Sequence, residues 1–426
     1  MHLPRWGRRL NLGAMKVGLF HPGTQHSWQT ARALQELDAL AFFATSIFYD
    51  PDRWPYRIER YLPGPIARRF HAEFRRFAAS GIDPRLVRTH GLFEWVERLC
   101  NRAGMLQLAK RIDRFGNRRF VRALAPAITG AEPFALWGYN ASSLESFRLA
   151  RSVGRTCILD RTIGDFRPYN RAMAAIRGEY GDFFLPGEHA IRDKVIERDD
   201  AEYRAADVIV VGSEFAAQTV RDGAGDADIA RKLRVLPYCY DEALFAGLPA
   251  SRPAREGPVR FLFLGQLSPR KGVHLALEAI ARLPRDAATL TLVGPMAIPA
   301  RTFERFADRV EYRPAVARAD VPGIMAAHDV FLMPSYFEGA GIVLYEALAA
   351  GMGIIQSGMC AEVATPDTGL YLDRLDTAAL VAAMESVIAD RAMLAGWRAH
   401  AQAKARQYAF AGYRDRIGAL LAELDR

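Results

Sequence analysis

The stretch that most constrains this chain runs from Asp329 to Gly351, because its hydrophobic period changes part-way along. The segment DVFLMPS is a short apolar run typical of a buried strand, and it reaches its end at Pro334. The later segment IVLYEALAAG places apolar residues at helical spacing until Gly351. Glycines at 339 and 341 allow a sharp turn between the two. The order of strand, tight glycine loop and helix predicts a parallel α/β sheet.

Two glutamates flank this turn. Glu338 stands just before the expected helix, and Glu346 lies two helical turns further along. In an open parallel sheet, ligands bind in the crevice at the carboxyl ends of the strands, and the first free amides of a helix favour an anion. A carboxylate at Glu338 therefore suits the hydroxyls of a sugar or a ribose. The alternative is that Glu338 is a helix cap and Glu346 a solvated helix residue.

The same pattern recurs along a chain of 426 residues, half of them apolar, which is long enough for two domains. Strands are expected at 17–20, 133–140, 155–166, 207–212, 261–264, 290–295 and 329–335. The expected organisation is a disordered leader at 1–14, a first domain at 15–247, a proline-rich linker at 248–258, a second domain at 259–405 and a C-terminal helix at 406–426 that crosses back to the first domain.

A second candidate site lies early in the second domain. Arg270 and Lys271 follow an apolar strand and precede a helix, and Gly294 stands at the end of the next strand. Helix amides, a guanidinium and an ammonium can together hold the two phosphates of a nucleotide diphosphate. The alternative is a solvated Arg-Lys pair.

Glu338 and Glu346, with seven residues between them inside EGAGIVLYEALAAG, resemble the donor-site signature of the retaining glycosyltransferases of family four, which have the GT-B fold. The resemblance implies an α/β protein of two Rossmann-like doubly wound domains facing a central cleft. It implies that Glu338 faces the transferred sugar and Glu346 the nucleotide ribose. Two residues depart from the family pattern, since Ala340 replaces an aromatic residue and Gly353 replaces a proline.

The resemblance extends into the first domain. RTCILDRTIGDF is similar to a family segment that often ends in histidine; Asp165 stands at that position, and Asp160 and Arg161 match its acidic and basic positions. Asp165 and Arg161 therefore join Glu338 as predicted catalytic residues. Gly23 begins a loop that borders the donor diphosphate in the family, although the loop could equally be a turn capped by Thr24. The predicted donor-binding residues are Gly23, Arg270, Lys271, Gly294, Gly339, Gly341 and Glu346.

The function implied is transfer of a hexose from a nucleotide sugar to a glycan or lipid-linked acceptor, with retention of the anomeric configuration. A phosphate oxygen of the donor would take the acceptor proton, so no cofactor and no metal are expected. The scattered cysteines offer no zinc spacing and no disulfide framework. The alternatives are an epimerase or phosphorylase on the same fold, or a non-catalytic basic protein that binds membrane or nucleic acid. A dehydrogenase is disfavoured because no GxGxxG follows an expected strand.

Positive charge is concentrated at the N-terminal end. The net charge is +9, but residues 1–130 hold 22 Lys/Arg and 10 Asp/Glu, a balance of +12 that leaves −3 for the rest. Two segments there, 66–77 and 108–119, combine a helical apolar face with clustered arginines, as membrane-interface helices do. Alternatively, the phenylalanines face the core and the arginines water; nucleic acid is the less favoured partner. With no run of eighteen apolar residues and no secretory h-region, we expect a cytoplasmic protein that contacts the inner face of the cell membrane.

Overall fold

The computed structural model describes residues 15–23, 26–52, 54, 56–74, 81–89, 120–249 and 256–426. Several predictions from the sequence lie outside the described residues, wholly or in part. They are the leader at 1–14, the turn residues Thr24 and Gln25, the end of the first basic segment at 75–77, the second basic segment at 108–119, and most of the linker, at 250–255.

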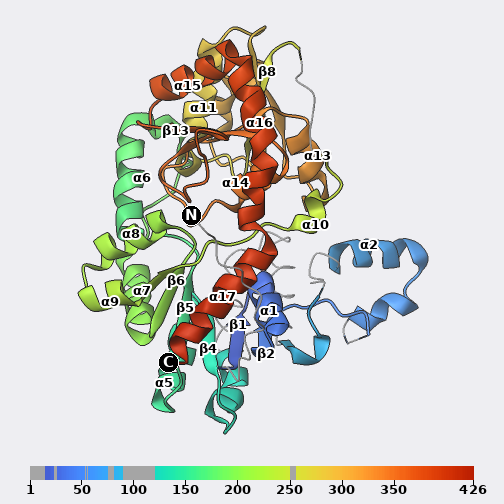
Figure 1. The fold of residues 1–426 in the computed structure, drawn as a ribbon, viewed down its shortest axis with the longest axis vertical. Helices are drawn as coiled ribbons and strands as arrows, with labels where there is room; N and C mark the ends of the chain where they lie inside the picture. The colour runs from blue at the N-terminus through green and yellow to red at the C-terminus, as the bar shows by residue number, and fades with distance from the viewer. Residues whose placement is uncertain are drawn as a thin grey trace, which may run out of the picture. The chain divides into compact units, whose positions relative to one another are not determined.

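The first sheet has seven strands in the order β3-β2-β1-β4-β5-β6-β7 (Figure 1). Its strands are β1 (Val17–His21), β2 (Leu40–Thr45), β3 (Val87–Thr89), β4 (Ala135–Tyr139), β5 (Cys157–Arg161), β6 (Val208–Val211) and β7 (Leu233–Val235). The pairs from β3 to β5 are parallel. Every residue of β1, β4 and β5 is buried, as expected for a parallel sheet covered on both faces.

Helices alternate with these strands along the chain. They are α1 (Ser27–Glu36), α2 (Gly64–Phe74), α5 (Leu144–Ser152), α6 (Phe166–Tyr180), α7 (Asp193–Ala205), α8 (Glu214–Ala224), α9 (Ala227–Lys232) and α10 (Glu242–Phe245). A short 3-10 helix, η1 (Tyr56–Tyr61), precedes α2. Side-chain caps start several of these helices: Ser213 accepts a hydrogen bond from Ala216 N at the start of α8, as N-cap serines commonly do.

The second sheet has six strands in the order β10-β9-β8-β11-β12-β13, and all of its neighbouring pairs are parallel. Its strands are β8 (Val259–Leu264), β9 (Ala288–Val293), β10 (Val310–Arg313), β11 (Val330–Met333), β12 (Gly353–Ser357) and β13 (Gly369–Leu372). The helices are α11 (Val273–Arg282), α12 (Ala300–Glu304), α13 (Val321–Ala326), α14 (Ile342–Ala349), α15 (Thr377–Ala389), α16 (Arg391–Ala405) and α17 (Phe410–Leu424). The predicted class, α/β with two Rossmann-like parallel sheets, is confirmed.

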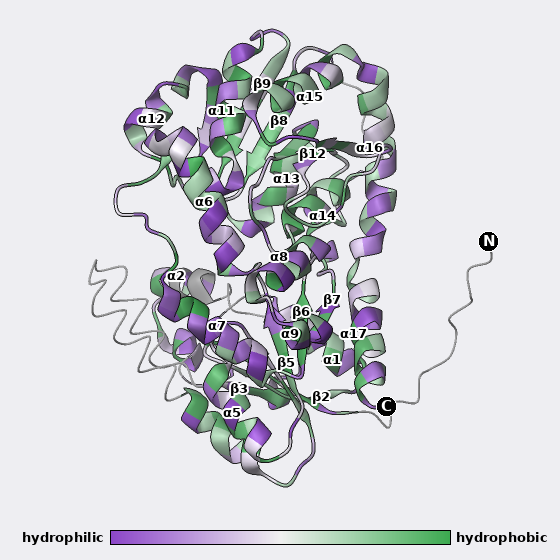
Figure 2. Ribbon diagram, turned by 90° about the vertical axis from the view of Figure 1, so that its left-hand side faces the viewer, coloured by the Kyte–Doolittle hydropathy of each residue, from purple (hydrophilic) through white to green (hydrophobic). Residues whose placement is uncertain are grey.

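The core beneath the second sheet explains which helices are apolar. Strand residues such as Phe261, Leu292 and Leu332 pack with α11 and α15 in one buried cluster, which Phe183 also joins. Figure 2 shows α14 as almost wholly hydrophobic, whereas α7 and α16 carry hydrophilic stretches. This difference follows from burial, because most of α14 is covered while one face of α16 meets solvent.

By internal contacts the chain divides into two compact units. The first comprises residues 1–160, 201–209 and 414–426, and the second comprises 161–200 and 210–413. Near the C-terminus, α16 and α17 are separated by the 3-10 turn η8 (Arg406–Tyr408). That turn brings Tyr408 face to face with Tyr345 of α14, with ring centroids 4.0 Å apart. The predicted domain boundaries stay a prediction.

Candidate functional site

Three loops of the second unit follow neighbouring strands at the carboxyl edge of the second sheet. They come after β8, β9 and β11, at residues 265–272, 294–299 and 334–341. The first two loops touch through their backbones, since Leu267 N donates a hydrogen bond of 3.0 Å to Pro295 O. A Cβ on Gly294, whose φ is 141°, would lie 1.9 Å from the carbonyl oxygen of Gly265. Only glycine fits there, so the predicted Gly294 sets the spacing of two loops rather than offering a side chain.

The predicted cations lie in a 3-10 turn, η5 (Pro269–Lys271), directly before α11. Gly272 ends this turn with φ 73°, and a Cβ there would lie 2.0 Å from the carbonyl oxygen of Pro334. The loop after β8 is thereby held against the loop after β11. Arg270 and Lys271 consequently project from a backbone whose position is fixed by close contact.

Glu338 lies between these two cations. Its Oε1 accepts a hydrogen bond of 2.8 Å from Arg270 Nη1 and one of 2.7 Å from Lys271 Nζ. The three side chains are mostly buried, with 12 to 20% of each exposed. Burial alone would raise the pKa of the Glu338 carboxyl, but Lys271 and Arg270 outweigh that effect and hold the pKa below its usual value. The sequence thus identified three residues that the fold brings into one cluster, here called the Glu338 cluster.

The Glu338 cluster combines two chemical abilities. Two cationic donors with one carboxylate leave a net charge of +1, which attracts an anion, and a guanidinium and an ammonium are the donors that phosphate oxygens prefer. The carboxylate in turn accepts hydrogen bonds from hydroxyl groups. A ligand bearing both phosphate and hydroxyl groups therefore matches this cluster.

Glycines after Glu338 let the backbone turn into α14. A Cβ on Gly339 would lie 1.9 Å from the carbonyl oxygen of Thr162, and the Gly339 carbonyl accepts a hydrogen bond from Ser213 Oγ. Gly341 begins the helix with φ 76°, in the left-handed region. Both predicted glycines are thus required by backbone geometry, and α14 starts with its free amides beside the Glu338 loop.

Glu346 has a separate partner. Its Oε1 accepts a hydrogen bond of 2.5 Å from Arg318 Nη2, and its side chain is buried. Burial raises the pKa of Glu346, and Arg318 only partly opposes that rise. The two glutamates of the motif therefore have pKa values shifted in opposite directions, because Glu338 has two cations and Glu346 has one.

Arg161 and Asp165, predicted as catalytic, occupy buried structural positions. Arg161 Nη1 donates to Asp199 Oδ2 at 2.6 Å and Nη2 donates to Gly164 O at 2.9 Å. Asp165 caps α6 by accepting a hydrogen bond of 2.8 Å from Arg167 N. Both residues belong to the second unit, and neither has a contact with Glu338 among those that the structure gives. Their catalytic role stays a prediction.

Gly23, in the first unit, lies just beyond β1. Its amide donates a hydrogen bond of 2.7 Å to His21 Nδ1. Burial lowers the pKa of His21 to about 4, so this ring is neutral near pH 7. The His21 ring packs edge-on against Tyr139, with centroids 4.7 Å apart. A contact between Gly23 and a donor diphosphate stays a prediction.

The two departures from the family pattern lie in closely packed surroundings. A Cβ on Gly212 would lie 2.7 Å from the Cβ of Ala340, so the glycine at 212 makes room for this methyl group. At Gly353, the indole of Trp397 occupies the space beside the α-carbon, 2.8 Å from an ideal Cβ. A proline there would also lose the hydrogen bond of 3.0 Å from Gly353 N to Asp329 O.

Some partners of the predicted site residues could not be found from the sequence. Arg318, the partner of Glu346, lies in a segment with no motif, and Asp199, the partner of Arg161, lies in a polar helix. Ser213 caps α8, and its hydroxyl also donates a hydrogen bond to the Gly339 carbonyl. Each partner is remote in sequence, so no local spacing could reveal it.

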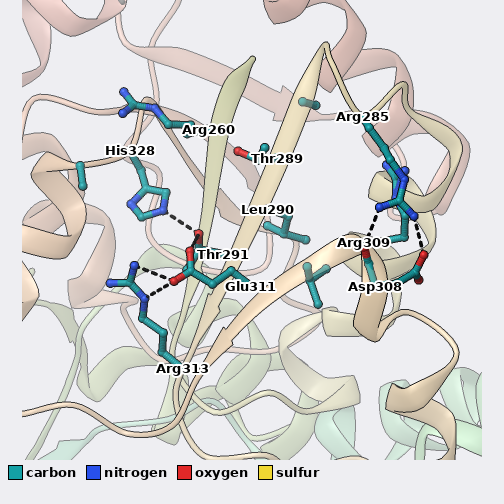
Figure 3. Close-up of a pocket in the computed structure, with 13 residues that line it drawn as sticks. Arg260, Arg285, Thr289, Leu290, Thr291, Asp308, Arg309, Glu311, Arg313 and His328 are labelled. Carbon is teal, nitrogen blue, oxygen red and sulfur yellow. Dashed lines mark hydrogen bonds and ion pairs between the residues drawn. The ribbon is translucent and has the colours of Figure 1, made fainter. Parts of the chain in front are cut away.

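A cavity of about 660 Å³ lies at the opposite edge of the second sheet (Figure 3). Its charged lining is largely paired internally, with Arg285 bound to Asp308 and Arg313 bound to Glu311. Most lining residues stand at the amino ends of β8 and β9 or just before β9, β10 and β11, and the others lie along the short edge strand β10. In open α/β sheets the ligand crevice is at the carboxyl ends, so this cavity is not the candidate site.

Comparison with known proteins agrees with this geometry. Residues 258–390 match the family model described as Glycosyl transferases group 1. The glycogen synthase of Mycobacterium tuberculosis is 31% identical over 34% of this chain and 37% of its own. The lipopolysaccharide glucosyltransferase WaaG of Escherichia coli is 41% identical over 21% and 26%. The chain thus spans about a third of the length of the first of these relatives and about a quarter of the second.

A longer match is to the GDP-mannose-dependent alpha-(1-6)-phosphatidylinositol monomannoside mannosyltransferase of Mycobacterium tuberculosis, 29% identical over 60% of this chain and 70% of that protein. Among solved structures, Anabaena HepE in complex with UDP has a TM-score of 0.59 at 17% identity, covering 96% of this chain and all of that one. Sucrose-phosphate synthase from Thermosynechococcus elongatus has a TM-score of 0.62 at 18% identity, covering 96% and 99%. The fold is GT-B. The strands of the second sheet, from β8 to β13, all lie within residues 258–390, the part of the chain that the group 1 family model matches.

Two other features are absent from the described residues. No group of three His, Cys, Asp or Glu in that part of the chain could hold a metal ion. No helix among the described residues has the length and apolar content needed to cross a bilayer.

Proposed function

We propose that the protein transfers a hexose from a nucleoside diphosphate sugar to a hydroxyl of a glycan or lipid-linked acceptor, with retention of the anomeric configuration. The observation that carries the proposal is the Glu338 cluster at the carboxyl edge of a group 1 glycosyltransferase domain. A nucleoside diphosphate sugar presents phosphate oxygens next to sugar hydroxyls, which is the pairing that this cluster matches.

In the proposed complex, Arg270 and Lys271 bind the diphosphate and neutralise the charge that grows on it as the bond to the sugar breaks. Glu338 then turns from its cations to the sugar hydroxyls, and Glu346 accepts hydrogen bonds from the ribose. The first amides of α14 add partial positive charge at the same edge. A donor phosphate oxygen takes the acceptor proton, so the protein's part is to position and to stabilise charge.

The relatives support the donor class. HepE was solved with UDP and with UDP-glucose, and the mycobacterial mannosyltransferase is named as dependent on GDP-mannose. Acceptors named among the relatives are lipopolysaccharide and a phosphatidylinositol mannoside, both lipid-linked. Retention follows from the resemblance of the Glu338 to Glu346 motif to family four.

The experiment is product analysis with candidate donors, UDP-glucose and GDP-mannose, and a lipid and glycan extract as acceptor. We expect sugar to appear on an acceptor, with its anomeric configuration unchanged by NMR. An inverted product would overturn retention. Recovery of an isomerised nucleotide sugar or a sugar phosphate, with nothing transferred, would overturn the transferase itself in favour of an epimerase or a phosphorylase.

A further inference from the structure

A surface of the first unit exposes large apolar side chains within one short segment. Trp54 is 70% exposed and Tyr61 is 74% exposed, and Ile58 and Ile66 are also exposed. Ile58 and Tyr61 belong to η1, Ile66 belongs to α2, and Trp54 lies two residues before η1. These four residues, here called the aromatic patch, were not singled out by the sequence, which placed Ile66 on a face turned to the core or to a membrane. Isolated exposed apolar residues are ordinary, but four within one short segment, on elements that pack together, are typical of an interaction site.

The patch stands on an anchored scaffold. Tyr56, in the same turn as Ile58 and Tyr61, is buried and packs with Tyr49 and Ile47. The Tyr49 hydroxyl donates a hydrogen bond of 2.8 Å to Glu59, in η1, and lies 3.2 Å from Nδ1 of His71, in α2. The segment α2 packs on η1 (blue in Figure 1). The apolar side chains are therefore held outward by inward-facing neighbours.

Charge around the patch is positive. Residues 54–68 contain three arginines and one glutamate, a balance of 3 − 1 = +2. That glutamate, Glu59, is engaged by Tyr49, and Arg60 pairs with Asp52. Among the described residues, Arg57 and Arg68 have no carboxylate partner. The arginines thus leave an exposed positive charge among aromatic and aliphatic side chains.

We propose that the aromatic patch docks on the surface of an anionic lipid bilayer, with Trp54, Ile58, Tyr61 and Ile66 in the interface and Arg57 and Arg68 on lipid phosphates. Tryptophan and tyrosine favour the boundary between water and hydrocarbon because each has an apolar ring with a polar atom. Arginines add attraction to anionic head groups that falls with salt. The proposal does not rest on the proposed sugar transfer.

The test is co-sedimentation of the full chain with vesicles of phosphatidylcholine, and with vesicles of phosphatidylcholine mixed with phosphatidylglycerol, at low and high salt. One variant combines Trp54→Ser with Tyr61→Ser, and a second combines Arg57→Gln with Arg68→Gln. Both pairs are exposed, so folding should be kept, and a melting curve checks it. Matched controls are Val153→Ser with Leu185→Ser, and Arg282→Gln with Arg374→Gln, which are also exposed.

We expect salt-sensitive binding of the parent to the anionic vesicles only. Removing two arginines should weaken that binding roughly tenfold to thirtyfold. The serine pair should weaken it as well, and both controls should bind like the parent.

Four outcomes would overturn the proposal. One is no binding of the parent to anionic vesicles at low salt. Another is equal binding by the folded serine pair, which would remove the aromatic patch from the interface. A third is salt-sensitive binding to RNA together with none to lipid. The fourth is a dimer in sedimentation velocity that becomes monomeric in the serine pair.

Discussion

Replacing Glu338 by glutamine separates the two tasks that the Glu338 cluster is proposed to perform. In the free protein the carboxylate accepts hydrogen bonds from Arg270 at 2.8 Å and from Lys271 at 2.7 Å, so it competes with a phosphate for both cations. Glutamine keeps the shape but removes the charge. Binding of a nucleoside diphosphate should therefore be kept or strengthened. Binding of the sugar should lose a charged hydrogen bond, about 1.5–3 kcal/mol, which is roughly tenfold to hundredfold in kcat/KM.

The assay pairs calorimetry of UDP and GDP binding with turnover of the corresponding nucleotide sugar. A melting curve at neutral pH belongs with it, because a carboxyl with a depressed pKa stabilises the fold above its usual pKa, and that stability is lost as the pH falls. Glu311→Gln is the matched control, since Glu311 also has an arginine partner and a lowered pKa but lies at the other edge of the sheet. Parent-like turnover by the folded Glu338 variant would refute the reasoning, and so would equal losses of diphosphate binding and turnover.

Three further predictions concern the cations, the loop glycines and acid stability. Arg270→Ala and Lys271→Ala should each weaken binding of a nucleoside diphosphate by roughly tenfold or more while leaving the nucleoside unaffected, and equal calorimetric losses for both ligands would count against a phosphate role. Gly339→Ala should lower the free energy of unfolding by about 1–3 kcal/mol, because the new Cβ would meet a carbonyl oxygen. Gly178→Ala, in open space on α6, should raise the free energy of unfolding by about 0.5–1 kcal/mol. Urea titrations in which both variants change stability in the same direction would contradict this. Burial lowers the pKa of His274 to about 3, so below pH 6.5 this histidine binds a proton in the unfolded chain but not in the folded chain, and the fold loses stability as the pH falls. The variant His274→Phe should therefore lose about 2 kcal/mol less stability than the parent between pH 7 and pH 5. Parallel plots of unfolding free energy against pH for variant and parent would contradict this.

Local sequence patterns predict part of this architecture. The change of period between DVFLMPS and IVLYEALAAG gave β11 and α14 in the right order, and the same reasoning placed β8 before Arg270 and Lys271. These elements were predictable because parallel strands buried on both faces are continuously apolar and their helices follow within a short loop. The convergence of Glu338 on the two cations follows from adjacency of β8 and β11 in the sheet, which the Rossmann order supplies.

Other features depend on contacts between residues far apart in the chain. Arg318 reaches Glu346 from a segment without a motif, and Asp199 reaches Arg161 across 38 positions. The exposure of Trp54 and Tyr61 was equally hidden, because an aromatic residue beside an arginine has the same local pattern whether it faces the core or water. Such features depend on tertiary packing, which local propensity does not encode.

The most direct measurement of the central claim is native mass spectrometry of the folded protein after incubation with a mixed pool of nucleoside diphosphate sugars. We predict that the parent retains one of them and that a variant combining Arg270→Ala with Lys271→Ala, with an unchanged melting curve, retains none. A parent that retains no nucleoside diphosphate sugar, or a double variant that retains it as well as the parent does, would contradict the assignment of the Glu338 cluster as the donor site.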